Sequence, residues 1–138
     1  MTASLADPEL LLGRWRMSRV VEDRRQATRS TVSGWLDLTR TADDRIHWAE
    51  SGRWHRPDAD VEVRRALWLV HQERGWWVLF EDGRDFHPWV PGDPVVHDCR
   101  PDTYGGLVTG TPERWTIRWD VSGPEKDYTM TTVLTPEG

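Results

Sequence analysis

Several features that are common in other proteins are scarce in this chain. Cys99 is the single cysteine among 138 residues, so no disulfide can form within the chain. Residues 1–12 have neither a basic start nor an apolar run of signal-peptide length. No stretch approaches the roughly 20 apolar residues of a membrane span. These absences predict a cytoplasmic protein with no membrane partner.

Positive charge and the familiar catalytic motifs are also in short supply. The 18 Lys and Arg residues are scattered among 23 Asp and Glu residues, for a net charge of −5, so nucleic acid is not an expected partner. There is no glycine-rich phosphate loop between a strand and a helix, and no Gly-x-Ser-x-Gly motif. His97 and Cys99 alone fall short of a zinc site's ligand set. We therefore expect no metal site and no cofactor.

Tryptophan is the residue that the chain has in excess. It has ten Trp residues but only two Phe and two Tyr, and its apolar fraction is only 37%. Each indole can bury about 150–250 Å² of surface. A few indoles are therefore expected to supply much of the core.

Apolar and polar residues alternate from Arg14 to Leu134, and no window keeps an apolar helical period. The clearest strand is 114–121, where Trp115, Ile117, Trp119 and Val121 share one face. Further strands are expected at 32–38, 46–54, 61–71, 76–81 and 127–134, and a short one near Val95, with a hairpin connection at 72–75 and a short helical turn at 7–12. Evenly spaced strands predict an all-β fold, a single antiparallel barrel of about eight or nine strands over residues 1–138.

One segment interrupts this alternation. The range 83–106 holds four of the nine Pro residues and four of the eleven Gly residues, so it does not read as a regular central strand. We expect a long Pro/Gly-rich loop or lid there. Long ordered loops often carry function, and this one contains His87, Trp89 and Tyr104.

The order of a short turn, then Gly13-Arg14-Trp15, then antiparallel strands resembles the calycin superfamily, which includes lipocalins, fatty-acid-binding proteins and nitrobindin-like haem proteins. The resemblance implies a lipocalin-like barrel whose base is closed by Trp15. It also implies a basic residue near the end of the last strand, and residues 134–138 contain none. The segments 80–84, 86–89 and 126–128 resemble a family of small bacterial proteins known only as a domain of unknown function, which implies no activity.

Strand alternation places three charged residues inside the barrel. Glu50 is in phase with Trp48, Arg65 is in phase with Leu67, and Arg19 falls on the inner face of the first strand. Because an unpaired buried charge costs several kcal/mol, we expect Glu50 to pair with Arg19 or Arg65. The alternative is that β-bulges shift the alternation and return these charges to solvent.

The sequence favours a protein that binds a small molecule inside the barrel. A partly polar interior suits an aromatic or polycyclic ligand with a polar group. The candidate ligand-binding residues are Arg19, Trp48, Trp54, Arg65, Trp89, Trp115, Trp119 and Tyr128.

Two other functions stay open. One is a cofactor-free isomerase, cyclase or hydrolase in the same pocket, with Glu50, His87 and Tyr104 as the groups that transfer protons. The other is a protein-interaction module that uses exposed Trp residues. The sequence does not decide among these functions, nor between a monomer and a homodimer.

Overall fold

The structure, a computed structural model, describes residues 4–137. These residues form one 10-stranded antiparallel sheet and one short 3-10 helix. In chain order the elements are η1 (Pro8–Leu11), β1 (Gly13–Asp23), β2 (Thr28–Arg40), β3 (Ile46–His55), β4 (Asp60–Gln72), β5 (Gly75–Phe80), β6 (Asp85–Pro88), β7 (Val95–Cys99), β8 (Asp102–Thr111), β9 (Arg114–Ser122) and β10 (Asp127–Pro136). The all-β antiparallel fold is confirmed, but the strand count exceeds the expected number of about eight or nine.

The segment 83–106 is not one long loop, so that expectation is wrong. It contains the short strands β6 and β7 and the beginning of β8. Pro88 ends β6, and Pro91 and Pro94 lie between β6 and β7. Proline is excluded only from positions whose N–H must join a ladder, and β6 and β7 are the two end strands of the sheet.

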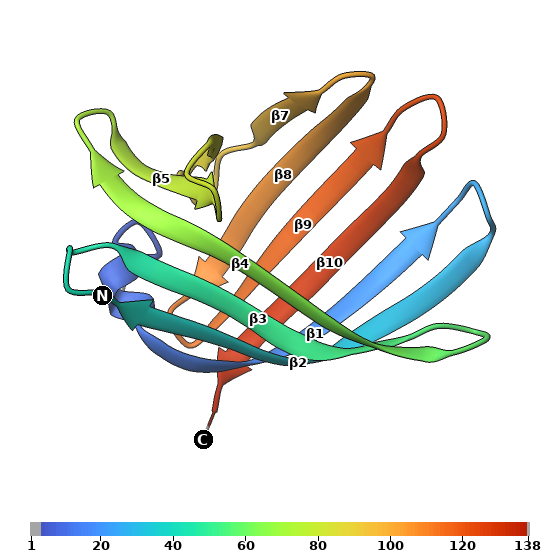
Figure 1. Ribbon diagram of the computed structural model, residues 1–138, viewed down its shortest axis with the longest axis horizontal. Coiled ribbons are helices and arrows are strands. Elements are labelled where there is room, and N and C mark those ends of the chain that lie inside the picture. Colours follow the sequence, from blue (N-terminus) through green and yellow to red (C-terminus); the bar gives the residue numbers. More distant parts are fainter. Residues whose placement is uncertain (1–3, 138) are drawn as a thin grey trace.

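The sheet curls into a nearly closed barrel (Figure 1), because β1 pairs with both β2 and β10. Within residues 4–137, no ladder joins the end strands β6 and β7. Side chains meet there instead. Phe86 of β6 lies edge to face with His97 of β7, with ring centroids 5.2 Å apart, and stacks on Trp119 at 5.1 Å.

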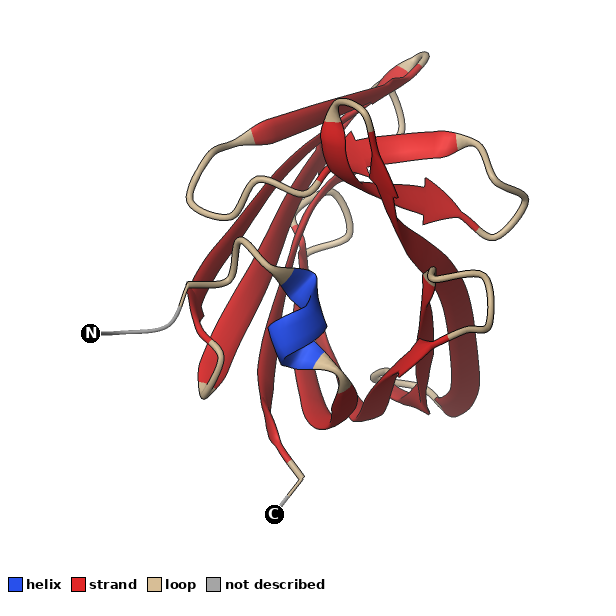
Figure 2. Ribbon diagram, turned by 90° about the vertical axis from the view of Figure 1, so that its left-hand side faces the viewer, coloured by secondary structure: helices blue, strands red, loops and turns tan. Residues whose placement is uncertain are grey.

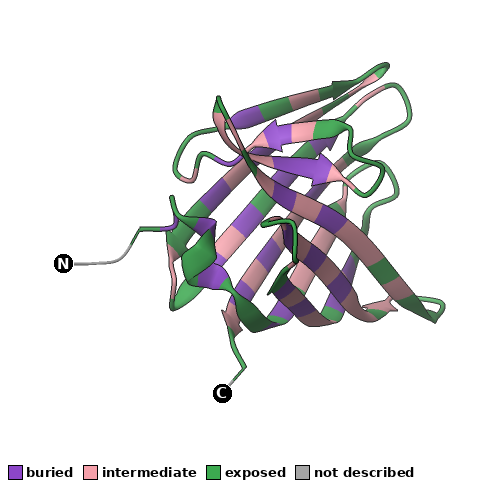
Figure 3. Cartoon of the chain, turned by 60° about the vertical axis from the view of Figure 1, so that its left-hand side comes forward, coloured by how far each residue is buried: buried purple, intermediate pink, exposed green. Residues whose placement is uncertain are grey.

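The alternation that predicted the strands is visible in their burial (Figure 3). On β9, Trp115, Ile117, Trp119 and Val121 are all buried, as expected. The hairpin between β4 and β5 also lies where the sequence places it. Gln72 pairs with Gly75, whose φ of +101° a residue with a side chain rarely adopts.

The short helix η1 lies at one end of the barrel (Figure 2), and a cluster of indoles packs at the same end. Leu11 of η1 is fully buried, and its carbonyl accepts a hydrogen bond of 2.7 Å from Trp15 Nε1. Trp89 Nε1 donates to the Leu5 carbonyl at 2.9 Å. The cluster itself consists of Trp15, Trp48, Trp89 and Trp115, packed edge to face. Among residues 4–137, no helix has the length and hydropathy to cross a membrane.

The outer face of the sheet carries indoles as well, each beneath a guanidinium group. Arg14 and Arg16 lie 4.9 and 4.7 Å from the ring of Trp35. Further stacks join Arg45 to Trp68 at 4.0 Å and Arg74 to Trp77 at 3.7 Å. Arginine stems and cation–π contacts thus cover apolar surface that alternation directs outward.

Candidate functional site

A pocket of ≈ 380 Å³ lies between strands β1 to β4 and β10, at the end of the barrel opposite η1. Its wall is mostly apolar and consists of Met17, Val21, Val32, Val63 and Met130. The predicted site residues that line it are Arg19, Glu50, Trp54, Arg65 and Tyr128. The fold therefore brings together residues from five strands.

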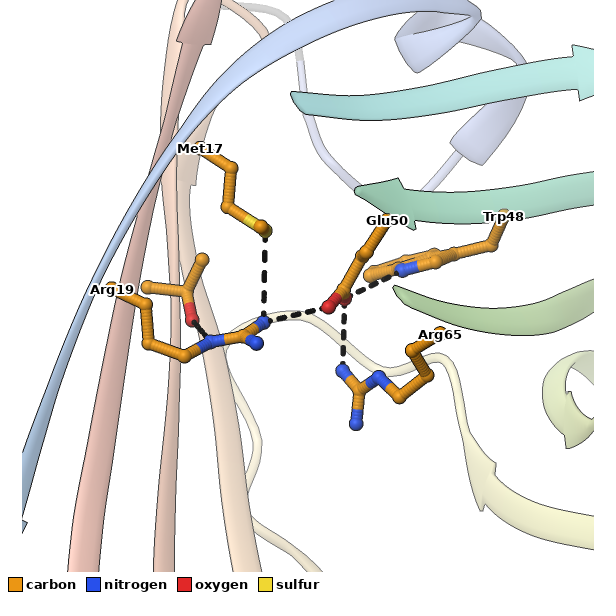
Figure 4. A network of polar contacts seen from close by, with 6 residues as sticks. Met17, Arg19, Trp48, Glu50 and Arg65 are labelled. Carbon is orange, nitrogen blue, oxygen red and sulfur yellow. Dashed lines mark hydrogen bonds and ion pairs between the residues drawn. The ribbon is translucent and has the colours of Figure 1, made fainter. Parts of the chain in front are cut away.

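An ion network centred on Glu50 forms the polar part of this pocket (Figure 4). Arg19 Nη2 donates to Glu50 Oε1 at 3.0 Å, and Arg65 Nη2 donates to Oε2 at 2.9 Å. Trp48 Nε1 donates to the same Oε2 at 2.9 Å. The expected pairing of Glu50 is thus confirmed, with both arginines at once.

The strand register explains why the charges meet inside. Glu50 of β3 lies directly opposite Arg65 of β4, and the pairing from Ile46 to His55 runs without a shift. No bulge therefore turns Glu50 to solvent, and its side chain is only 5% exposed. The alternative in which bulges expose these charges is wrong for Glu50.

The Glu50 carboxyl stays ionised at neutral pH. Burial alone would raise its pKa, but the charges of Arg65 and Arg19, with hydrogen bonds from Arg65 and Trp48, outweigh burial and lower the pKa to about 2. One carboxylate therefore faces two guanidinium groups. This network carries one unit of excess positive charge.

The two arginines differ in how firmly they are held. Arg19 is 13% exposed, and its Nε donates to Thr132 Oγ1 at 2.7 Å. Arg65 is 37% exposed, and its Nε is buried without an acceptor among the described residues. Sequence reasoning missed Thr132, although its phase with Met130 on the last strand indicates an inward position.

The other predicted ligand-binding indoles lie outside this pocket. Trp48, Trp89 and Trp115 belong to the cluster at the closed end, and Trp119 packs against Phe86. Trp48 is nevertheless tied to the network through Glu50. Trp54 does line the pocket, and its Nε1 donates to Ser30 Oγ at 2.9 Å.

The three residues considered for acid–base chemistry do not share one space. His87 lines only a void of ≈ 10 Å³, and its Nδ1 lies 2.8 Å from the Pro88 carbonyl oxygen. Burial is the main cause that lowers the pKa of His87 to about 4. Tyr104 lines a separate groove of ≈ 700 Å³, and its hydroxyl accepts from Lys126 Nζ at 3.2 Å.

No group of three or more His, Cys, Asp or Glu side chains within residues 4–137 is arranged to hold a metal ion. Cys99 is exposed on β7. His97 contacts the aromatic rings of Phe80, Phe86 and Tyr104.

Two solved structures share this fold at low sequence identity. S-type phycobiliprotein lyase CPES from Guillardia theta has a TM-score of 0.66 and 14% identity, over 94% of this chain and 90% of the lyase chain. A redesigned β-barrel, mFAP0, bound to DFHBI, has a TM-score of 0.52 and 14% identity, over 92% of this chain and 99% of its own. The likeness shows a shared antiparallel β-barrel fold.

Sequence comparison supplies the family. No curated protein matches the chain. Residues 11–136 match a family of unknown function, DUF6314, and the protein belongs to that family.

Proposed function

We propose that the protein binds one small organic molecule in the pocket between β1 to β4 and β10. The observation that carries this proposal is the pocket itself: an apolar wall surrounds a fixed set of charges. Its volume of ≈ 380 Å³ falls within the range of about 300–1,000 Å³ that is usual for ligand sites. Ligand sites commonly combine apolar walls with a few well-placed polar groups.

The wall suits a ligand with an aromatic or polycyclic body. Trp54 and Tyr128 offer ring surface, and Met17 and Met130 offer flexible side chains that adapt to a ligand's outline. Burial and the neighbouring Tyr104 raise the pKa of Tyr128 to about 12. The Tyr128 phenol, like an ordinary tyrosine, is protonated at neutral pH and has a hydrogen to donate.

The polar groups are positioned before any ligand arrives. Arg19 is held between Glu50 and Thr132 by hydrogen bonds of 3.0 and 2.7 Å. A ligand therefore loses little free energy in ordering that side chain. The redesigned barrel of similar fold, bound to DFHBI, supports the proposal by analogy.

The test is the binding of a neutral fluorescent probe, N-phenyl-1-naphthylamine, to the purified protein. We expect saturable fluorescence enhancement, and at least tenfold weaker binding after Val63→Trp, which fills the pocket wall. The control is Val96→Trp, the same substitution at a side chain that is 65% exposed on β7. Binding that survives Val63→Trp in a folded protein would place the ligand elsewhere and refute the proposal.

A further inference from the structure

We propose that the ligand is an organic acid with a single negative charge, such as a carboxylate, and that its acidic group binds Arg65. This inference rests on the proposed function, because it specifies the chemistry of the molecule in the same pocket.

The charge balance of the pocket is the first observation. Its charged lining residues are Arg19, Arg64 and Arg65 against Asp23 and Glu50, which leaves one positive charge in excess. Arg64 is largely exposed to solvent. Asp23 is the last residue of β1 and accepts a hydrogen bond from the Gln26 backbone N–H. Around Glu50 itself, two guanidinium groups therefore face one carboxylate, beside an apolar wall where a counter-ion from water is poorly solvated.

Glu50 itself is not available to a ligand. Its oxygens already accept from Arg19, Arg65 and Trp48, and the side chain is 5% exposed. A cationic ligand would have to displace one of these donors from a buried carboxylate. The network thus favours an acceptor of hydrogen bonds over a donor.

Arg65 is the group that an acidic ligand can reach. It is more exposed than Arg19, and it lines both the ≈ 380 Å³ pocket and the neighbouring ≈ 700 Å³ groove. Its buried Nε lacks an acceptor among the described residues, and an unpaired buried N–H is costly. A carboxylate accepts two parallel N–H bonds from one guanidinium, so it can bind the terminal nitrogens of Arg65, and a small shift of the side chain would let it satisfy Nε as well.

The number of charges follows from the same balance. A monoanion neutralises the single excess charge. A dianion such as a phosphate monoester would leave one negative charge uncompensated in the pocket. A neutral molecule would leave the positive charge uncompensated. The pocket therefore selects an acid with one charge on an apolar body.

The experiment compares two probes with one ring skeleton: 8-anilino-1-naphthalenesulfonate, a monoanion, and neutral N-phenyl-1-naphthylamine. Charge-assisted hydrogen bonds predict that the wild-type protein binds the sulfonate roughly 10- to 100-fold more tightly. Arg65→Met should abolish this preference, because it weakens the binding of the sulfonate far more than that of the neutral probe. The matched control is Arg53→Met, which removes the same charge from an exposed position on β3.

A second variant acts in the opposite direction. Glu50→Gln raises the excess charge from one to two, so the sulfonate should bind more tightly still while the neutral probe does not. The wild-type ratio of the two affinities decides the question if Arg65→Met does not fold.

The two proposals fail in different ways. Equal affinity for both probes, or a preference that Arg65→Met leaves intact, overturns the inference about the acid but leaves the proposed pocket function standing. If neither probe binds, the proposed function fails, and this inference fails with it.

Discussion

Gly34 of β2 lies directly opposite Gly52 of β3, and neither position has room for a side chain. A β-carbon on Gly34 would run into the Ser51 carbonyl oxygen and lie 2.6 Å from Gly52 Cα. On the other side of β2, Met17 of β1 pairs with Gly34 and is almost fully buried. The two glycines thus allow β2 to approach β3, the strand that carries Glu50, closely.

We expect Gly34→Ala to lower the free energy of unfolding by about 1–3 kcal/mol or more, because the clash is with backbone that cannot rotate away. Urea denaturation, monitored by circular dichroism, measures this change in the free energy of unfolding. Gly105→Ala is the control, since its β-carbon would lie 3.8 Å from the Asp120 carbonyl oxygen, an ordinary contact. Equal stabilities for the two variants would contradict the close approach.

Glu50→Gln should destabilise the fold by roughly 3–5 kcal/mol at neutral pH, because it leaves two partly buried guanidinium groups without their counter-charge. Glu62→Gln, an exposed carboxylate on β4, should change stability by less than about 0.5 kcal/mol. Chemical denaturation of both variants tests this prediction. A loss of similar size in both would show that the network adds nothing to stability.

The effect of Glu50→Gln on stability should depend on pH. The pKa of Glu50 is lowered from 4.5 to about 2 in the folded protein, so its stabilising contribution is complete above pH 4.5 and is lost as the pH falls toward 2. The stability difference between wild type and Glu50→Gln should therefore narrow over that interval. A constant difference from pH 5 down to about pH 2.5 would argue against an ionised Glu50.

His87 should make the stability of the fold depend on pH over a second interval, which lies higher than that of Glu50. Because burial lowers its pKa from 6.5 to about 4, the folded state resists protonation, and stability is lost as the pH falls from 6.5 through 4. His87→Asn keeps a donor for the Pro88 carbonyl but does not titrate. We expect it to flatten the stability profile over this interval, as measured by thermal unfolding at stepped pH. An unchanged slope would assign the acid sensitivity to other groups.

Trp15→Phe should loosen the closed end of the barrel. The substitution removes the hydrogen bond of 2.7 Å to the Leu11 carbonyl and part of a buried ring. A loss of about 1–3 kcal/mol is expected, with faster amide exchange at β1 and at residues 9–12. Trp35→Phe, on the outer face, provides the comparison. Unaltered exchange in Trp15→Phe would show that the indole does not hold η1 in place.

Local alternation predicted the strands and the inward direction of Glu50, because the two-residue period of a strand is a property of the backbone. It did not predict the position of a side chain along the barrel. Trp48 and Trp54 share one face of β3, yet Trp48 joins the closed end and Trp54 lines the pocket. Which end a residue occupies depends on strands far away in the sequence.

Two further features could not be derived from the sequence alone. The Pro and Gly content of 83–106 hid β6, because nothing local marks a strand as the end of a sheet, whereas β7 lies where a short strand near Val95 was expected. The partners of Glu50 come from β1 and β4, and the sequence offered Arg19 and Arg65 as alternatives. Strand register places Arg65 opposite Glu50, and Arg19 reaches the same carboxylate from β1, across β2.

The contact between Phe86 and His97, on the two end strands, affects the circumference of the barrel. Elsewhere the perimeter is fixed by backbone ladders, whose spacing does not depend on which side chains are present. Between β6 and β7, whose described residues share no ladder, the packing of aromatic rings contributes to it. Substitution at this seam can therefore widen or narrow the barrel in small steps without breaking a backbone hydrogen bond. The internal space of this fold is thus open to adjustment by single mutations far from the pocket that uses it.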